Sequence, residues 1–327
     1  MRASVLALCV NAGMACAAAP ATANKPGASG YPARPVRFII PFPPSGGTDI
    51  VGRSIGQKVG DALGQVFVID NRAGAAGTLG ADIAAKAHPD GYTILLATAS
   101  FAISAGYYKS LPYDPVRDFA GVSRIASGPL LLVTHPAVPA RSVKELIALA
   151  RASPNKLNYA SGGAGGINHL AGELFASMTG AGIVHVPYKG AGPALAGLLG
   201  GEVQMMIVPL GASLPQVRAG KLRALAVASA QRSTMVPDLP TVAETGVRGY
   251  EADNWYGILA PRGTPQSIIT LLNTHIVAAL RADDTRERFA TLGFEPVSST
   301  PRQFEDYLRA EIAKWSKAMR DAGMSQN

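Results

Sequence analysis

Cysteine is nearly absent from this sequence of 327 residues, and both copies, Cys9 and Cys16, lie close to the amino terminus. The rest of the chain therefore forms no disulfide bond and offers neither a thiol nucleophile nor cysteine ligands for zinc. Long apolar runs are also missing after the first 23 residues, whereas a membrane-spanning helix needs about 20 apolar residues. We expect a soluble protein of one or two domains.

The first residues, MRASVLALCVNAGMACAAAPATA, have one early cation, then an apolar stretch and then small residues. This is the layout of a secretory signal peptide with an A-x-A cleavage site, for which Ala21-Thr22-Ala23 fits best. We expect residues 1–23 to be a signal peptide, residues 24–35 to be a linker, and the mature chain to be exported.

Cations are not concentrated anywhere, although the formal net charge is +8. The sequence has no run of four or more basic residues and no basic patch with interleaved aromatic residues, so nucleic acid is not an expected partner. A scattered positive charge is typical of a solvated surface, and it mildly favours anionic small molecules.

Short apolar runs alternate with helical patterns along the mature chain. The predicted strands are VRFIIPF, VFVID, YTILLAT, LLLVTH, LNYAS, IVHVPY, VQMMIVP, LRALAVAS and YGILAP. Continuous apolar runs of this kind are typical of parallel strands buried on both faces. Predicted helix starts are the capping box at residues 142–145 and the cap-proline pairs Thr264-Pro265 and Thr300-Pro301. The alternation predicts an α/β fold, and the length favours two lobes with a ligand cleft between them.

The motifs of nucleotide and metal chemistry are missing. The stretch PFPPSGGTDI, residues 41–50, has the glycines of a phosphate loop but no lysine before Thr48. The glycines of residues 71–77 and 163–168 do not have the spacing of a dinucleotide fingerprint. His169 is not followed by the second histidine of a zinc helix. We therefore expect no cofactor and no metal.

Ser161 follows a predicted strand and precedes glycines, as a hydrolase nucleophile would. The first glycine of the G-x-S-x-G elbow is absent, since the sequence reads Tyr159-Ala160-Ser161-Gly162-Gly163. His169 or His185 could serve as a base, but nothing in the sequence links either to Ser161. A secreted serine hydrolase using Ser161 stays open as an alternative.

Two glycine-rich turns remain, at residues 44–48 and 161–166. Each is predicted to start a helix, where unpaired backbone N–H groups and the positive end of the helix dipole favour an anion. Such a turn binds a carboxylate as readily as a phosphate. The alternative is that both are only tight turns, in which glycine supplies a positive φ angle.

The order of several motifs makes the chain similar to a known family. They are FPPSGGTDIVGR, VIDNRAGAAGTLGAD, HPDGYTILLAT, LPYDPVRDF, KLNYASGGAGGINHLAGELF, VHVPYKGAGPALAGLLGGEV, VRAGKLRALAV, LPTVAETG and WYGILAPRGTP. In this combination the sequence resembles the substrate-binding receptors of tripartite tricarboxylate transporters, the Bug family, from about Tyr31 to Gly323.

The resemblance implies the type II periplasmic-binding-protein fold, with two α/β lobes around a ligand cleft. Lobe 1 would comprise residues 36–132 and 255–327, and lobe 2 residues 133–254. It implies a non-enzymatic, monomeric periplasmic receptor that delivers a small carboxylate to membrane permease subunits. A solute sensor not coupled to transport is the other alternative. The resemblance implies these ligand-binding residues: Phe42, Pro44, Ser45, Gly46, Gly47, Thr48, Asp49, Thr98, Ala99, Ser100, Ser161, Gly162, Gly163, Ala164, Gly165, Gly166, His169 and Val208.

Two positions depart from the pattern of the family. Many members place an aspartate after the strand VQMMI, where this chain has Val208 and Pro209. Many have threonine or serine where this chain has Gly166. Both changes remove polar contacts, so we expect a carboxylic acid without an ammonium group.

Overall fold

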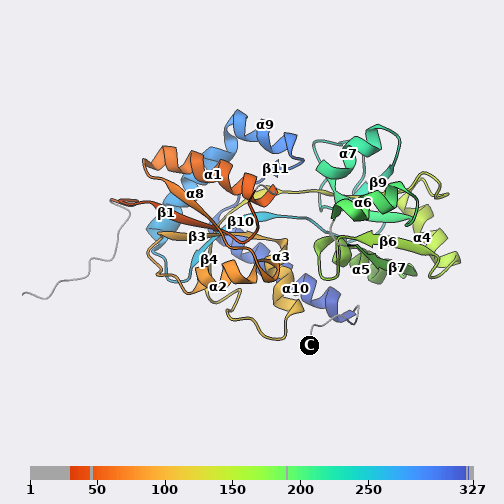
Figure 1. Cartoon of the computed structure of the whole chain (residues 1–327), viewed down its shortest axis with the longest axis horizontal. Helices are drawn as coiled ribbons and strands as arrows, with labels where there is room; N and C mark the ends of the chain where they lie inside the picture. Colours follow the sequence, from red (N-terminus) through yellow and green to blue (C-terminus); the bar gives the residue numbers. More distant parts are fainter. Residues whose placement is uncertain (1–29, 45–46, 189–190, 322, 324–327) are drawn as a thin grey trace, which may run out of the picture.

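The structure is a computed structural model that describes residues 30–44, 47–188, 191–321 and 323. Two lobes lie side by side along the long axis of the molecule (Figure 1). Lobe 1 is built on a six-stranded sheet with the strand order β11-β4-β10-β3-β1-β2, and lobe 2 on a five-stranded sheet with the order β7-β6-β8-β5-β9. The predicted two-lobed α/β architecture is confirmed.

The strands of lobe 1 come from both ends of the chain. They are β1 (Val36–Ile40), β2 (Phe67–Asn71), β3 (Thr93–Thr98), β4 (Phe119–Ser127), β10 (Tyr256–Pro261) and β11 (Glu295–Pro296). The strands of lobe 2 are β5 (Leu130–Thr134), β6 (Leu157–Ser161), β7 (Ile183–Pro187), β8 (Met205–Pro209) and β9 (Arg223–Val227). Every predicted strand is therefore found.

The prediction that the strands are parallel is correct for only part of each sheet. β1 is parallel to β2 and β3, and β6 is parallel to β7 and β8. In contrast, β10 is antiparallel to β3 and β4, and β5 is antiparallel to β8 and β9. Every residue of β5 and β10 is buried. A continuous apolar run thus reports burial on both faces and not strand direction.

Helices cover both faces of each sheet. Those of lobe 1 are α1 (Gly47–Leu63), η1 (Ala75–Gly77), α2 (Thr78–Ala85), α3 (Ala99–Tyr107), α8 (Gln266–Arg281), α9 (Asp283–Thr291) and α10 (Pro301–Asp321). Those of lobe 2 are α4 (Val143–Ala152), α5 (Ile167–Thr179), α6 (Ala191–Leu199) and α7 (Leu210–Arg218). α1, α8 and α9 share one apolar core in lobe 1, while α2, α3 and α10 lie on the opposite face (Figure 1).

All three predicted helix starts are found, and two of the three predicted caps are confirmed. The Ser142 hydroxyl accepts the N–H of Glu145, and Thr300 and Gln303 exchange hydrogen bonds between side chain and backbone. The third helix, α8, begins directly after Pro265, but its predicted cap is wrong, because the Thr264 hydroxyl donates to the carbonyl of Pro261 and caps no helix N–H. Thr264 instead closes the turn that follows β10.

The chain crosses between the lobes at two neighbouring points. The segments around Gly128 and Asn254 hydrogen-bond to each other through their backbones, at 3.1 and 3.4 Å. Beside them, the buried Asp253 accepts from Ser127 and pairs with Arg124. Arg124 and Ser127 belong to β4, a strand that the sequence analysis missed because its polar residues interrupt the apolar pattern. These contacts join both crossings into one connection.

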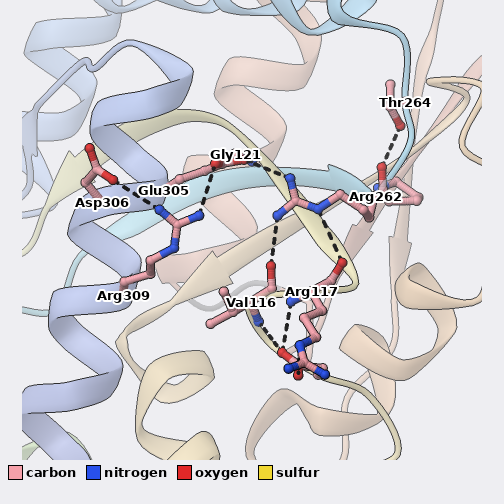
Figure 2. A network of polar contacts seen from close by, with 10 residues as sticks. Val116, Arg117, Gly121, Arg262, Thr264, Glu305, Asp306 and Arg309 are labelled. Atoms are coloured by element: carbon pink, nitrogen blue, oxygen red, sulfur yellow. Dashed lines mark hydrogen bonds and ion pairs between the residues drawn. The ribbon is translucent and has the colours of Figure 1, made fainter.

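The carboxy-terminal helix α10 fastens this connection to lobe 1. The buried Glu311 accepts from the indole N–H groups of Trp255 and Trp315, at 2.9 and 3.0 Å. Nearer the start of α10, Glu305 accepts from Arg262 and from the N–H of Gly121, while Arg262 also donates to the carbonyls of residues 116 and 117 (Figure 2). The beginning and the end of β10 are thereby both fixed to α10.

Candidate functional site

A cavity of about 520 Å³ lies between the lobes. Lobe 1 and the crossing segment contribute Phe42, Thr48, Ala76, Thr98, Ser100, Ile103, Ser104, Tyr107, Tyr108, Asn254 and Tyr256, and lobe 2 contributes Gly162, Gly163, Ala164, Gly165, Gly166, Ile167, Asn168 and Ala191. A wider groove of about 650 Å³ beside α1 and β2 is lined by lobe 1 alone. The first cavity is therefore the one that a ligand could occupy between the lobes.

The cavity is polar but carries no charged side chain among the described residues that line it. Its polar groups are hydroxyls, the amides of Asn168 and Asn254, and backbone atoms. Burial raises the pKa of Tyr256 to about 12, an effect that hydrogen bonds with Thr48 and Asn254 partly offset. The phenol is thus neutral at physiological pH. A charged ligand would be recognised here by dipoles and not by an opposite charge.

Helix starts from lobe 1 reach this cavity. Thr48 lies in the first turn of α1, and Thr98 is the extended N-cap residue of α3, followed in the cavity wall by Ser100. The Thr98 side chain does not cap the helix. The first N–H groups of α1 and α3 therefore have no partner within their own helices, as at every helix start.

The predicted residues of the first glycine turn divide into three groups. Phe42 and Thr48 line the cavity, whereas Pro44 and Gly47 are exposed outside its lining. Ser45 and Gly46 lie outside the described residues. The structure therefore brings part of the predicted turn to the cavity.

Asp49 lies behind this turn. It is 3 % exposed and pairs with Arg53 at 2.8 Å, the i,i+4 pairing that the helical spacing allows. The side-chain amide of Asn71 donates both to Asp49, at 2.9 Å, and to the backbone carbonyl of Phe42, at 3.0 Å. Asp49 is thus placed to hold the turn between β1 and α1.

The second glycine turn forms the lobe 2 wall of the cavity. All of its predicted residues from Gly162 to Gly166 line the cavity. Gly163 and Gly165 have positive φ angles of 135° and 77°, which favour glycine. Gly166 is the N-cap of α5 and has no side chain to cap the helix, so the first N–H groups of α5 also lack helical partners.

Tyr107 of lobe 1 reaches across to this turn. A methyl group built at Gly165 would lie 3.1 Å from the Cζ atom of Tyr107, so the aromatic ring lies directly against the glycine. Tyr107 and Tyr108 pack edge to face, with their ring centroids 5.3 Å apart. The glycine at position 165 therefore serves both the backbone conformation and the contact between lobes.

Besides Asp49, four predicted residues are buried outside the cavity lining. Ser161 and Ala99 are fully buried, Val208 is 1 % exposed in the apolar core of lobe 2, and His169 is 6 % exposed. Ala99 lies between two cavity residues, Thr98 and Ser100, on the inner side of α3. The position of Val208, where many relatives were expected to have aspartate, therefore contributes apolar packing here.

Ser161 and His185 resemble a hydrolase pair in one distance only. The Ser161 Oγ atom lies 2.6 Å from the His185 Nε2 atom. However, Ser161 is fully buried, whereas a nucleophile must reach the substrate. The nearby Glu173 accepts from the Tyr159 hydroxyl and lies 3.7 Å from His169, so it is not the third member of a triad with His185.

Several lining residues were not found by the sequence analysis: Ala76, Ile103, Ser104, Tyr107, Tyr108, Ile167, Asn168, Ala191, Asn254 and Tyr256. Strand alternation could have identified two of them. Trp255 is fully buried, so its neighbours Asn254 and Tyr256 lie on the other side of the backbone, toward the cavity. The others depend on how the lobes meet, which the sequence pattern does not contain.

The described part of the chain contains neither a metal site nor a membrane-spanning helix. No group of three or more His, Cys, Asp or Glu residues there could hold a metal ion. None of the described helices has the length and apolarity needed to cross a membrane.

Comparison with known proteins assigns this architecture to a family. The family model of the tripartite tricarboxylate transporter family receptor matches residues 51–324. Protein BugT of Bordetella pertussis is 42 % identical over 308 residues, covering 94 % of this chain and 93 % of BugT.

Two solved structures agree with this match. The R. palustris protein Rpa4515, solved with adipate, is 40 % identical with a TM-score of 0.75, covering 90 % of this chain and 100 % of Rpa4515. The periplasmic binding protein BugD is 33 % identical with a TM-score of 0.72, covering 90 % of this chain and 100 % of BugD.

Two lobes with a cavity between them, and the likeness to these structures, define a solute-binding protein, and the predicted periplasmic-binding fold is confirmed. The chain belongs to the receptors of the tripartite tricarboxylate transporter family, the Bug proteins. It is therefore a solute receptor of a transporter and not an enzyme, and its family places it in the periplasm. The serine-hydrolase alternative receives no support.

The contact between Tyr107 and Gly165 can be tested without a ligand. Gly165→Ala should lower the free energy of unfolding by about 2 kcal/mol, because a side chain at positive φ costs about 1–2 kcal/mol and the methyl group also meets the ring. Gly180→Ala is the matched control: it lies at the other end of α5 with φ 62°, and its nearest neighbour would be Arg151 Nη2 at 3.9 Å. Gly180→Ala should lower the free energy of unfolding only through the positive φ angle of the backbone.

Urea denaturation of both variants, and of each combined with Tyr107→Ala, measures the coupling. Removing the ring should relieve part of the cost of Gly165→Ala and none of the cost of Gly180→Ala. If Gly165→Ala lowers the free energy of unfolding equally with and without Tyr107→Ala, Tyr107 does not pack on this glycine.

Proposed function

We propose that this receptor captures a small carboxylate between its lobes and delivers it to the membrane permease subunits of a tripartite tricarboxylate transporter. The observation that carries the proposal is the cavity between the lobes, where helix starts from both lobes meet and no described lining side chain is charged. The adipate bound by Rpa4515 supports the same class of ligand.

The carboxylate would be held by backbone dipoles. The N–H groups at the starts of α1, α3 and α5 are unpaired within their helices, and the positive ends of the helix dipoles favour an anion there. Hydroxyl groups of Thr48, Thr98 and Ser100 can donate further hydrogen bonds, directly or through water. Together they offer donors on more than one side of the cavity.

We therefore propose two roles for the predicted site residues. Phe42, Thr48, Thr98, Ser100 and Gly162 to Gly166 would face the ligand, because they line the cavity. The buried residues Asp49, Ala99, Ser161, His169 and Val208 would shape the wall from behind. Pro44 and Gly47 are exposed outside the lining, and with Ser45 and Gly46 they complete the proposed turn.

An ammonium group on the ligand would find no acidic partner in the described lining. Burying an unpaired charge costs several kcal/mol, which is enough to decide between an amino acid and its deaminated analogue. The proposed ligand is therefore a carboxylic acid without an essential ammonium group.

Calorimetric titration of matched pairs tests the ligand class. Succinate should bind more tightly than aspartate, and adipate more tightly than 2-aminoadipate. In the pair with the higher affinity, the dissociation constants of the two partners should differ at least tenfold. If the ammonium-bearing partner binds more tightly in both pairs, an acidic group reaches the ligand and the proposal is wrong. If no acid of either kind binds, the carboxylate class itself is refuted.

One position offers a matched pair of variants for the same titration. Ser100→Asp places a carboxylate at the cavity in the first turn of α3, where it favours the helix but repels an anionic ligand. Its affinity for the best-bound acid should fall at least tenfold while its melting temperature stays close to that of the parent. Ser100→Asn has the shape of the aspartate side chain without its charge, so its affinity for the acid should stay close to that of the parent.

Closure of the lobes on the ligand is the proposed mechanism of capture. A ligand that contacts both lobes binds the closed state better and shifts the population toward it. The adjoining segments at Gly128 and Asn254 are the proposed hinge, close to the predicted lobe boundaries at residues 132 and 254.

Small-angle X-ray scattering, with and without a saturating acid chosen by the titration, measures this closure. We expect a smaller radius of gyration with the ligand. Tight binding without any compaction would contradict closure and leave a receptor whose lobes are already closed. The same experiment gives the molecular mass in solution, for which we predict a monomer.

A further inference from the structure

A cluster of polar side chains lies under the second glycine turn, outside the cavity lining. It consists of Ser161 on β6, His169 on α5 and His185 on β7, and we term these three residues the loop-support cluster. Tyr159 of β6 and Glu173 of α5 flank it. The rings of His169 and His185 stack with centroids 3.7 Å apart. Ser161 and His169 are buried and His185 is half-buried. Such polar groups in a receptor without catalysis require an explanation.

The tautomer of His169 follows from one hydrogen bond. The backbone N–H of Gly165 donates to the Nδ1 atom of His169 at 3.1 Å. A backbone N–H is always a donor, so Nδ1 must be unprotonated and the ring proton lies on Nε2, which is 3.7 Å from Glu173. Burial lowers the pKa of His169, which keeps the imidazole in this neutral form.

Ser161 makes an equivalent contact two residues earlier in the turn. Its hydroxyl oxygen accepts the N–H of Gly163 at 3.1 Å and lies 3.1 Å from the carbonyl of the same residue. The Nε2 atom of His185 lies 2.6 Å from the same hydroxyl oxygen and forms a hydrogen bond with it. Burial, followed by the neighbouring His169, lowers the pKa of His185 to about 4, so this ring is neutral too.

The two contacts fix alternate residues of the turn. The N–H groups of Gly163 and Gly165 are directed to the loop-support cluster, while the N–H of Ala164 between them has no hydrogen-bond partner among the described residues. Ala164 lines the cavity, as does Ile167, the first residue of α5. The cluster thus occupies the N–H groups of Gly163 and Gly165, and the N–H of Gly166 donates to the carbonyl of Gly163 at 3.4 Å. The N–H of Ala164 is left available to the cavity.

We propose that Ser161 and His169 are positioning residues that hold the glycine turn from beneath and thereby direct its remaining N–H groups toward the ligand. This rests on the proposed function, in which the turn binds a carboxylate, and it gives Ser161 and His169 a role without direct ligand contact. The action of His169 depends on an unprotonated acceptor at the position of Nδ1.

A pair of substitutions at one residue separates positioning from packing. In His169→Asn, the side-chain oxygen can take the place of Nδ1 and accept from Gly165, although much of the ring is lost. In His169→Leu, apolar volume is retained but the acceptor is gone. Glu173→Gln is the control, since Glu173 contacts Tyr159 and His169 but neither Gly163 nor Gly165.

The first measurement needs no ligand. In protein labelled with ¹⁵N-glycine, the Gly165 amide signal, assigned by its loss in Gly165→Ala, should exchange with solvent slowly in the parent, in His169→Asn and in Glu173→Gln. In His169→Leu the exchange should be at least tenfold faster. Unchanged exchange in His169→Leu would overturn the proposed support of the turn.

The second measurement uses adipate as the probe in calorimetric titration. His169→Leu should weaken binding at least tenfold, while His169→Asn and Glu173→Gln should stay within about threefold of the parent. Parent-like binding by His169→Leu, or equal losses in His169→Leu and His169→Asn, would overturn the positioning role. If the parent does not bind adipate, this ligand is wrong for the proposed function, and the exchange measurement alone decides the role of His169.

Discussion

The starts of four helices, α1, α3, α5 and α6, contribute residues to the wall of one cavity: Thr48, Thr98, Gly166 and Ala191. Each helix start leaves backbone N–H groups without helical partners, and the dipole adds a positive potential there. Because the described lining has no charged side chain, these backbone groups would supply most of the attraction for an anion. A backbone group cannot change its rotamer to adapt to a ligand, so the proposed site depends on how each helix start is held.

Buried polar side chains hold these starts in both lobes. In lobe 1, Asn71 connects the Phe42 carbonyl to Asp49, behind the turn that precedes α1. In lobe 2, Ser161 and His169 hold the turn that precedes α5. Around the cavity, Tyr107 rests on Gly165, and the crossing segments are joined through Asp253 and Arg124. Ser161 and His169 therefore serve the geometry of the turn, and a serine close to a histidine is not a sign of catalysis here.

The sequence contained the elements but not their arrangement. Apolar runs located nine of the strands, and the second glycine turn located one wall of the cavity, because both are local patterns. Strand direction was missed for β5 and β10, since burial on both faces looks alike in either direction. Strand β4 was missed because polar residues interrupt its apolar pattern: Ser123 hydrogen-bonds to Ser299, and Arg124 pairs with Asp253 at the crossing. Tyr107 and Asn254 line the cavity only because the lobes meet, a long-range property that no local pattern encodes.

The central claim is that backbone N–H groups of both lobes, and not charged side chains, bind the carboxylate. Amide chemical shifts of ²H,¹⁵N-labelled protein during titration with adipate and succinate test it most directly. The account predicts that the largest downfield proton shifts occur at Thr48, Ala164 and residues 167–168, and that they saturate together. Saturable binding whose largest shifts lie elsewhere, for example around the groove beside β2 that includes Arg53, would contradict it.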